Sequence, residues 1–182
     1  MLTVQELNAK MLHGRALQRQ EDPTVLFEIA SLGSSYVEIG TRWGGSAIVA
    51  GLAGCDVYCI DPWAYSEKDL QHRTSPQHVL ENWLHAGLDA DKLHLFQQAH
   101  PPWPEALLDR SFATGMIDGA HVETNVRSDW GSMRIHVTGH VLFHDMAKAC
   151  VRAVFREAES DPDWEPITIV RMSQFGIVRR RN

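Results

Sequence analysis

Residues 37–46 read Val-Glu-Ile-Gly-Thr-Arg-Trp-Gly-Gly-Ser, a glycine-rich turn from which the fold can be predicted. It begins inside a short β-rich run, Tyr36–Ile39, which the glycines that follow interrupt. From Ser46 to Leu52 small residues predominate and favour a helix. Glycines in such a turn let the backbone approach a ligand closely, and the helix that follows offers free N–H groups. The sequence therefore predicts a ligand-binding turn between a first strand and a helix.

Beyond this turn, β-rich runs and helical stripes alternate. Four further strands are expected, at Val57–Ile60, Leu93–Phe96, Phe112–Ile117 and His140–Phe143. Between the last two of these strands, apolar residues recur at steps of three and four, which predicts a helix with one buried stripe. The residues of that stripe are Val122, Val126, Trp130, Met133 and Val137. A second stripe, from Ala147 to Ala158, predicts the next helix.

The alternation of strands and helices ends near the C-terminus. Two β-rich runs, Ile167–Val170 and Phe175–Val178, are separated by only four residues. Parallel strands need a crossover of a dozen or more residues, so this pair must be antiparallel. The predicted fold is an α/β, Rossmann-like three-layer αβα sandwich with a mostly parallel sheet and an antiparallel C-terminal hairpin. We expect a single domain overall, with helices over residues 1–34 packing on a core that spans residues 35–182.

Composition limits the classes of partner. The chain has 182 residues, 44% of them hydrophobic, and a formal net charge of −6, which argues against nucleic acid as a partner because phosphate binding needs clustered basic residues. The one basic run, Arg179–Arg181, is interpreted as a solvated tail. No apolar run approaches the roughly 18 residues that span a bilayer, and the first residues lack a signal-peptide pattern. A cytoplasmic protein with a small-molecule substrate is expected, and the N-terminal helices could cover its pocket or form a homo-oligomer.

A carboxylate ends the second predicted strand. Asp61 follows Gly40 by about twenty residues, where an acid can accept both ribose hydroxyls of a nucleoside ligand. The glycine spacing is Gly-x-x-x-Gly with Glu38 before it, whereas a pyrophosphate needs denser glycines. The spacing, the C-terminal hairpin and the absence of a second domain favour S-adenosylmethionine over a nicotinamide dinucleotide. An oxidoreductase is therefore the weaker alternative.

Five segments carry a family resemblance. They are VEIGTRWGGSA (37–47), CIDPW (59–63), LENWLHAGLDADKLHLFQ (80–97), FATGMIDGAHVETNVRSDW (112–130) and GHVLFHDM (139–146). In this order they resemble class I S-adenosylmethionine-dependent methyltransferases. The resemblance is to a group of small bacterial O-methyltransferase-like proteins, related to the macrolide-sugar O-methyltransferases and the cephalosporin hydroxylase-like proteins. The IDGAH and FHDM pieces are the most specific.

The resemblance implies a seven-stranded sheet in the order 3-2-1-4-5-7-6 and a set of cofactor-binding residues. Those residues are Glu38, Gly40, Thr41, Gly44 and Ser46 on the methionine and ribose side, Asp61 at the ribose, and Trp63 and Asp118 nearby. Trp63 either stacks on adenine or packs under the following loop. Relatives commonly carry acids at three positions where this chain has Ala99, Ala113 and Ala120.

Two polar pairs follow the fourth and fifth strands, which are neighbours in such a sheet. Asp118 with His121, and His144 with Asp145, could serve either of two chemistries. Asp118 and Asp145 could bind a divalent metal such as Mg²⁺. Alternatively, His121 or His144 could be the general base that takes a proton from a substrate hydroxyl. Two purely structural interpretations stay open: Asp145 as the N-cap of the next helix, and Asp118-Gly119 as a turn.

The sequence thus predicts a methyltransferase that modifies a small molecule, most simply at oxygen, by in-line methyl transfer. The polar stretch from Ala64 to Pro76 is expected to be a lid or acceptor-selecting loop. The alternatives are a protein of this fold without methyltransferase activity, either cofactor-binding or hydroxylase-like, and a nucleic-acid methyltransferase, which the lack of a basic face disfavours.

Overall fold

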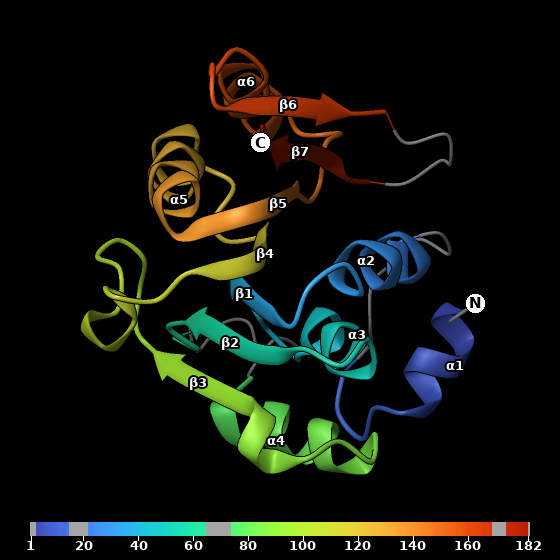
Figure 1. Ribbon diagram of the computed structural model, residues 1–182. Coiled ribbons are helices and arrows are strands. Elements are labelled where there is room, and N and C mark those ends of the chain that lie inside the picture. Colours follow the sequence, from blue (N-terminus) through green and yellow to red (C-terminus); the bar gives the residue numbers. More distant parts are fainter. Residues whose placement is uncertain (1–2, 15–21, 65–73, 169–173, 182) are drawn as a thin grey trace.

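The fold is built on one twisted sheet. The computed structural model describes residues 3–14, 22–64, 74–168 and 174–181. Seven strands lie side by side in the order β3-β2-β1-β4-β5-β7-β6 (Figure 1), which confirms the predicted order. The strands are β1 Ser35–Ile39, β2 Asp56–Asp61, β3 Leu93–Gln97, β4 Phe112–Ile117, β5 Val137–Phe143, β6 Trp164–Ile167 and β7 Gly176–Arg180.

The first five strands are parallel and the last two are antiparallel. β1 pairs with β2 on one side and with β4 on the other, both in parallel register. β7 runs antiparallel to both β5 and β6, which confirms the C-terminal hairpin. The carboxyl ends of β1 to β5 therefore meet at one edge of the sheet, and the strand order reverses at β1.

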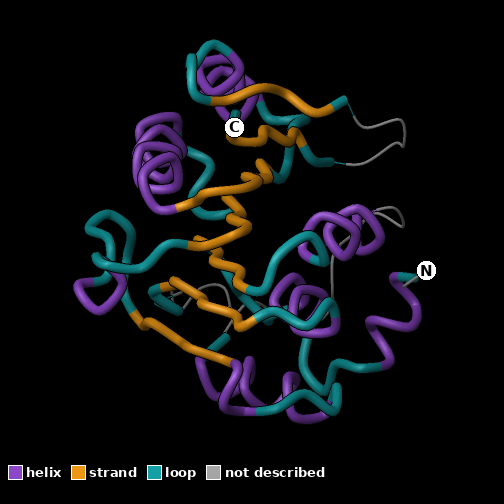
Figure 2. Tube along the Cα trace, viewed as in Figure 1, coloured by secondary structure: helices purple, strands orange, loops and turns teal. Residues whose placement is uncertain are grey.

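Helices cover both faces of the sheet (Figure 2). They are α1 Val4–Ala9, α2 Asp22–Ala30, α3 Gly45–Leu52, α4 Pro76–His85, α5 Glu123–His136 and α6 Ala149–Glu159, with short 3₁₀ turns at Ala90–Lys92 and Glu105–Leu107. Buried residues of α2, α3 and α4 belong to one apolar cluster, and those of α5 and α6 belong to the other. The sheet separates the two apolar clusters, so adjacent residues of β1 point to different ones: Tyr36 packs in the first cluster and Val37 in the second.

Local sequence signals set several helix ends. The Thr3 hydroxyl accepts from the Glu6 amide and the Glu6 carboxylate accepts from the Thr3 amide, which forms a capping box at the start of α1. At the start of α4 the Ser75 hydroxyl accepts from the His78 amide, and Pro76 occupies the first turn. These caps satisfy amides that have no partner inside the helix.

The structure corrects four local predictions. Val137 belongs to β5 rather than to the preceding helix, because α5 ends at His136 and the strand follows without a loop. β6 spans Trp164–Ile167 rather than Ile167–Val170, and Val170 lies outside the described residues. Asp145 does not cap α6, whose N-cap is Lys148. The predicted solvated tail is mostly strand, since β7 extends to Arg180.

The N-terminal helices share the core of the sheet. Leu7 of α1 and Leu26 of α2 are fully buried in the same cluster as the residues of α3. The boundary at residue 34 stays a prediction. Most of the predicted lid, residues 65–73, lies outside the described residues. Within the described part of the chain, no helix is long and apolar enough to cross a membrane.

Candidate active site

The glycine turn is shaped by its contact with β4. Gly40 has a φ of 90°, and a Cβ there would lie 2.3 Å from the carbonyl oxygen of Asp118. Only glycine combines this backbone conformation with so close an approach. Gly44, at a φ of 81°, is the N-cap of α3. The two glycines therefore allow the chain to turn sharply from β1 into α3 beside the end of β4.

Asp61, the last residue of β2, fixes the turn from the side. Its Oδ2 accepts from the amides of Thr41 and Arg42, each at 2.9 Å, and its Oδ1 accepts from the amide of Trp63 at 2.7 Å. The side chain is almost wholly buried. Because hydrogen bonds to a charged acceptor are the strong ones, this carboxylate organises both the turn after β1 and the one after β2.

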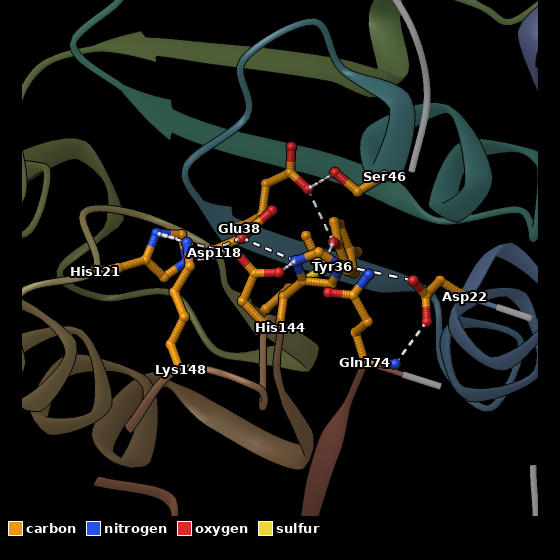
Figure 3. A network of polar contacts seen from close by, with 11 residues as sticks. Asp22, Tyr36, Glu38, Ser46, Asp118, His121, His144, Lys148 and Gln174 are labelled. Carbon is orange, nitrogen blue, oxygen red and sulfur yellow. Dashed lines mark hydrogen bonds and ion pairs between the residues drawn. The ribbon is translucent and has the colours of Figure 1, made fainter. Parts of the chain in front are cut away.

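Glu38 lies beneath the turn, not in it. Its Oε2 accepts from the hydroxyls of Tyr36 at 2.9 Å and Ser46 at 2.6 Å (Figure 3). Burial raises the pKa of Glu38 to about 7, although hydrogen bonds from Ser46 and Tyr36 oppose the shift. Glu38 was expected to line the ligand site; the structure places it behind Ser46 as a support.

A cavity of about 1360 Å³ opens at the carboxyl ends of the strands. The predicted site residues that line it are Gly40, Thr41, Ser46, Asp61, Asp118, His121, His144 and Asp145. Glu38, Gly44 and Trp63 are not among its lining residues. The indole of Trp63 is buried, and its Nε1–H donates to the Arg42 carbonyl at 3.1 Å. This position matches the packing interpretation of Trp63.

Three non-glycine residues at this edge have left-handed backbones. Their φ values are 52° for Arg42, 44° for Trp63 and 58° for Asp145, and within the described residues no other side-chain-bearing residue has a positive φ. Each follows the end of a strand, β1, β2 or β5. Such strain persists where the surrounding structure imposes it, which is frequent at ligand sites.

A charged cluster lines the cavity where β4 and β5 end. His121 Nε2 lies 3.3 Å from Asp145 Oδ2 and 3.6 Å from Asp118 Oδ1. The Lys148 ammonium donates to His121 Nδ1 at 2.8 Å (Figure 3). It also lies 2.7 Å from Asp145 Oδ2. Burial raises the pKa of Asp118, but hydrogen bonds from His121 and His144 outweigh it and leave the pKa below its usual range.

His144 lies between two carboxylates. Its Nδ1 donates to Asp118 Oδ1 at 3.1 Å, and its Nε2 lies 3.8 Å from Asp22 Oδ2 (Figure 3). Burial alone lowers the pKa of His144, but the carboxylates of Asp118 and Asp22 raise it to about 10. The ring is therefore an imidazolium near neutral pH and has no lone pair with which to accept a proton. This geometry disfavours the prediction that His144 is a general base.

The family follows from a comparison with known sequences. Residues 37–146, more than half of the chain, match the model of the methyltransferase domain family. The chain belongs to this methyltransferase family. The matched segment contains the glycine turn, Asp61 and the whole charged cluster except Lys148. A sequence search against curated proteins finds no match.

Solved structures share the fold of this methyltransferase. An O-methyltransferase from Bacillus cereus in complex with SAH has a TM-score of 0.72 and 14% identity, covering 98% of this chain and 89% of that one. The O-methyltransferase TomG from Streptomyces achromogenes, in complex with SAM, has a TM-score of 0.67 and 12% identity over 98% and 89%. A cofactor-bound protein from MTB, Rv0187, has a TM-score of 0.71 and 18% identity over 97% and 86%.

The charged cluster was also predicted as a metal site. Asp118, His121 and Asp145 offer ligand atoms within 4.8 Å of one another. However, the Lys148 ammonium already pairs with Asp145 and His121, and the His144 ring pairs with Asp118. Two cationic side chains on these ligands oppose a divalent ion by like-charge repulsion. The residues present fit an ion-pair network better than a metal, and the metal stays a prediction.

Several residues of this site are not indicated by the sequence alone. Lys148 is three residues after Asp145, and this spacing could have indicated the pair. Asp22, at the start of α2, is fully buried, and its Oδ1 accepts from the Gln174 amide at 2.8 Å. His100 and Asp129 line the cavity together. No local pattern predicts these last contacts, because they join distant parts of the chain.

Proposed function

We propose that this protein transfers the methyl group of S-adenosylmethionine to a hydroxyl oxygen of a small molecule. The observation that carries the proposal is that one cavity joins the turn fixed by Asp61 to the cluster around His121. The strand order reverses at β1, and ligands of open α/β sheets bind at such a switch point. A donor site and an acceptor site thus share one space.

The donor would lie over the turn. Gly40, Thr41 and Ser46 line the cavity where the methionyl part would bind, and Asp61 Oδ1 would accept a ribose hydroxyl with its remaining lone pair. When bound, the cofactor supplies an electrophilic methyl carbon, whose bond to sulfur breaks with the electron pair staying on sulfur as the acceptor oxygen bonds to carbon. The turn and Asp61 hold these groups in line.

His121 is the residue proposed to take the acceptor proton. The Asp145 carboxylate lies beside its Nε2, so the neutral ring would keep its proton there and present the Nδ1 lone pair, now occupied by Lys148. The Lys148 side chain is 44% exposed and can move aside for a substrate hydroxyl. Nδ1 would then accept the hydroxyl proton, and the resulting imidazolium would be stabilised by Asp118 and Asp145.

Two measurements test the proposal. Calorimetric titration with S-adenosylhomocysteine should show binding, and labelled S-adenosylmethionine should transfer its methyl group to members of a panel of phenols and sugars. His121→Gln should keep the affinity for S-adenosylhomocysteine and lower kcat by about 10²- to 10⁴-fold. The control is His85→Gln, which changes an exposed histidine on α4. Binding without transfer to any acceptor in the wild type would overturn the catalytic part of the proposal.

A further inference from the structure

The cavity also borders a buried pair outside the charged cluster, His100 and Asp129. His100 follows β3 and Asp129 lies in α5, and their side chains are 1% and 2% exposed. The Nδ1 of His100 is 2.6 Å from Asp129 Oδ1, and its Nε2 is 2.9 Å from the hydroxyl of Ser132. Both residues line the cavity. The pair is therefore rigid and at the same time borders the space that a ligand would fill.

The proton positions in this pair follow from its donors and acceptors. An ionised carboxylate only accepts, so His100 carries its proton on Nδ1 and donates to Asp129. The neutral ring then accepts at Nε2 from the Ser132 hydroxyl. In this arrangement Oδ1 of Asp129 accepts the His100 proton, and this hydrogen bond fixes the orientation of the carboxylate.

The hydrogen bond of Asp129 within the described residues is on Oδ1, so its second oxygen is left to face the cavity. It lies beside Gly119, where an added Cβ would approach it to 3.2 Å. A largely buried acceptor without a partner is costly unless a ligand supplies a donor. Ala99 and Ala120, the neighbours of His100 and Gly119 in the sequence, are small and line the same cavity. An oriented acceptor thus borders a slot with little side-chain bulk.

The sheet order indicates which part of a ligand would reach this slot. β3 lies next to β2 on one side, whereas β5 and its charged cluster lie beyond β1 and β4 on the other. A nucleoside whose ribose is at Asp61 and whose sulfur faces His121 has its base directed toward the end of β3. We propose that Asp129 Oδ2 accepts the 6-amino group of the cofactor's adenine, with His100 as a positioning residue, and thereby selects adenine over 6-oxo purines.

This inference rests on the proposed donor site, and its test separates the two. The probes are S-adenosylhomocysteine and S-inosylhomocysteine, which carries a 6-oxo group, and the measurement is calorimetric Kd for each. In Asp129→Asn the amide oxygen would stay on the His100 proton, so its NH₂ group would replace Oδ2 and turn an acceptor into a donor. The wild type should prefer the adenosyl ligand by about tenfold or more, and the variant should lose or reverse that preference.

The control is Asp56→Asn, an exposed aspartate at the start of β2, which should leave both Kd values unchanged. Equal discrimination in the wild type and in Asp129→Asn would show that the pair is structural only and would overturn the inference. Failure of the wild type to bind S-adenosylhomocysteine at all would instead overturn the donor site. If Asp129→Asn does not fold, the wild-type comparison decides: equal affinity for the two probes contradicts the inference.

Discussion

Asp61→Asn is the substitution that most directly probes how the turn is held. The carboxylate accepts three backbone amides, two on Oδ2 and one on Oδ1. Asparagine has a single acceptor oxygen, so in either orientation its NH₂ group faces at least one buried N–H. The loss of one hydrogen bond to a charged acceptor costs about 1.5–3 kcal/mol. The other two amides then donate to a neutral amide oxygen instead of a carboxylate, which weakens their hydrogen bonds as well. We expect a total loss of about 2–4 kcal/mol in the free energy of unfolding.

This loss can be measured by thermal denaturation. For a chain of this length, 1 kcal/mol shifts Tm by about 2–4 °C, so Asp61→Asn should melt roughly 5–15 °C below the wild type. The matched control, Asp56→Asn, removes an exposed carboxylate from the same strand and should melt with the wild type. An Asp61→Asn protein with wild-type Tm and wild-type affinity for S-adenosylhomocysteine would show that Asp61 neither shapes the turn nor contacts the ligand.

Three further outcomes follow from the same geometry. Gly40→Ala should lose about 3 kcal/mol of stability and its affinity for S-adenosylhomocysteine, because its Cβ would collide with the Asp118 carbonyl; urea denaturation and calorimetry check this. Burial raises the pKa of Glu38 to about 7, so the wild type loses stability as pH rises from its unfolded value near 4.5 through 7. The glutamine of Glu38→Gln does not titrate, so the stability of this variant relative to the wild type should rise by about 2–3 kcal/mol between pH 5 and pH 8. A stability difference that does not change with pH would show that the pKa of Glu38 is not raised. EDTA should leave methyl transfer unchanged and Mg²⁺ should not raise Tm, because the Lys148 ammonium already pairs with Asp145 in the cluster. Methyl transfer that depends on Mg²⁺ would show that the cluster binds a metal.

The sheet could be predicted from the sequence because each strand is marked by its own composition and each crossover by its length. The short separation of the two β-rich runs is enough to predict that β6 and β7 form an antiparallel hairpin. β6 was misplaced by three residues because Pro166 interrupts its β-rich pattern. β6 is the edge strand of the sheet, where proline is tolerated because its missing N–H faces no partner strand.

The end of α5 illustrates a different limit. Val137 continues the apolar spacing of the helix, and neither glycine nor proline separates it from His136. Periodicity alone therefore carries the helix one step too far. The parallel pairing of β5 with β4, a contact between residues far apart in the sequence, is what imposes the strand conformation there.

The sequence motifs predict where the site lies but not the role of each residue in it. The prediction that polar residues meet at the ends of β4 and β5 is confirmed, since Asp118, His121 and Asp145 come together. The support role of Glu38 and the protonation of His144 depend on burial and on partners such as Asp22, which is 122 residues away from His144. Such partners are fixed by tertiary packing, which local sequence does not encode.

A crystal structure with S-adenosylhomocysteine would show where the methyl donor binds. We predict the homocysteine part over the turn at Gly40–Ser46, the ribose hydroxyls within hydrogen-bond distance of Asp61, and the sulfur facing His121. Ordered ligand in any other place, or a ribose with no contact to Asp61, would contradict the account.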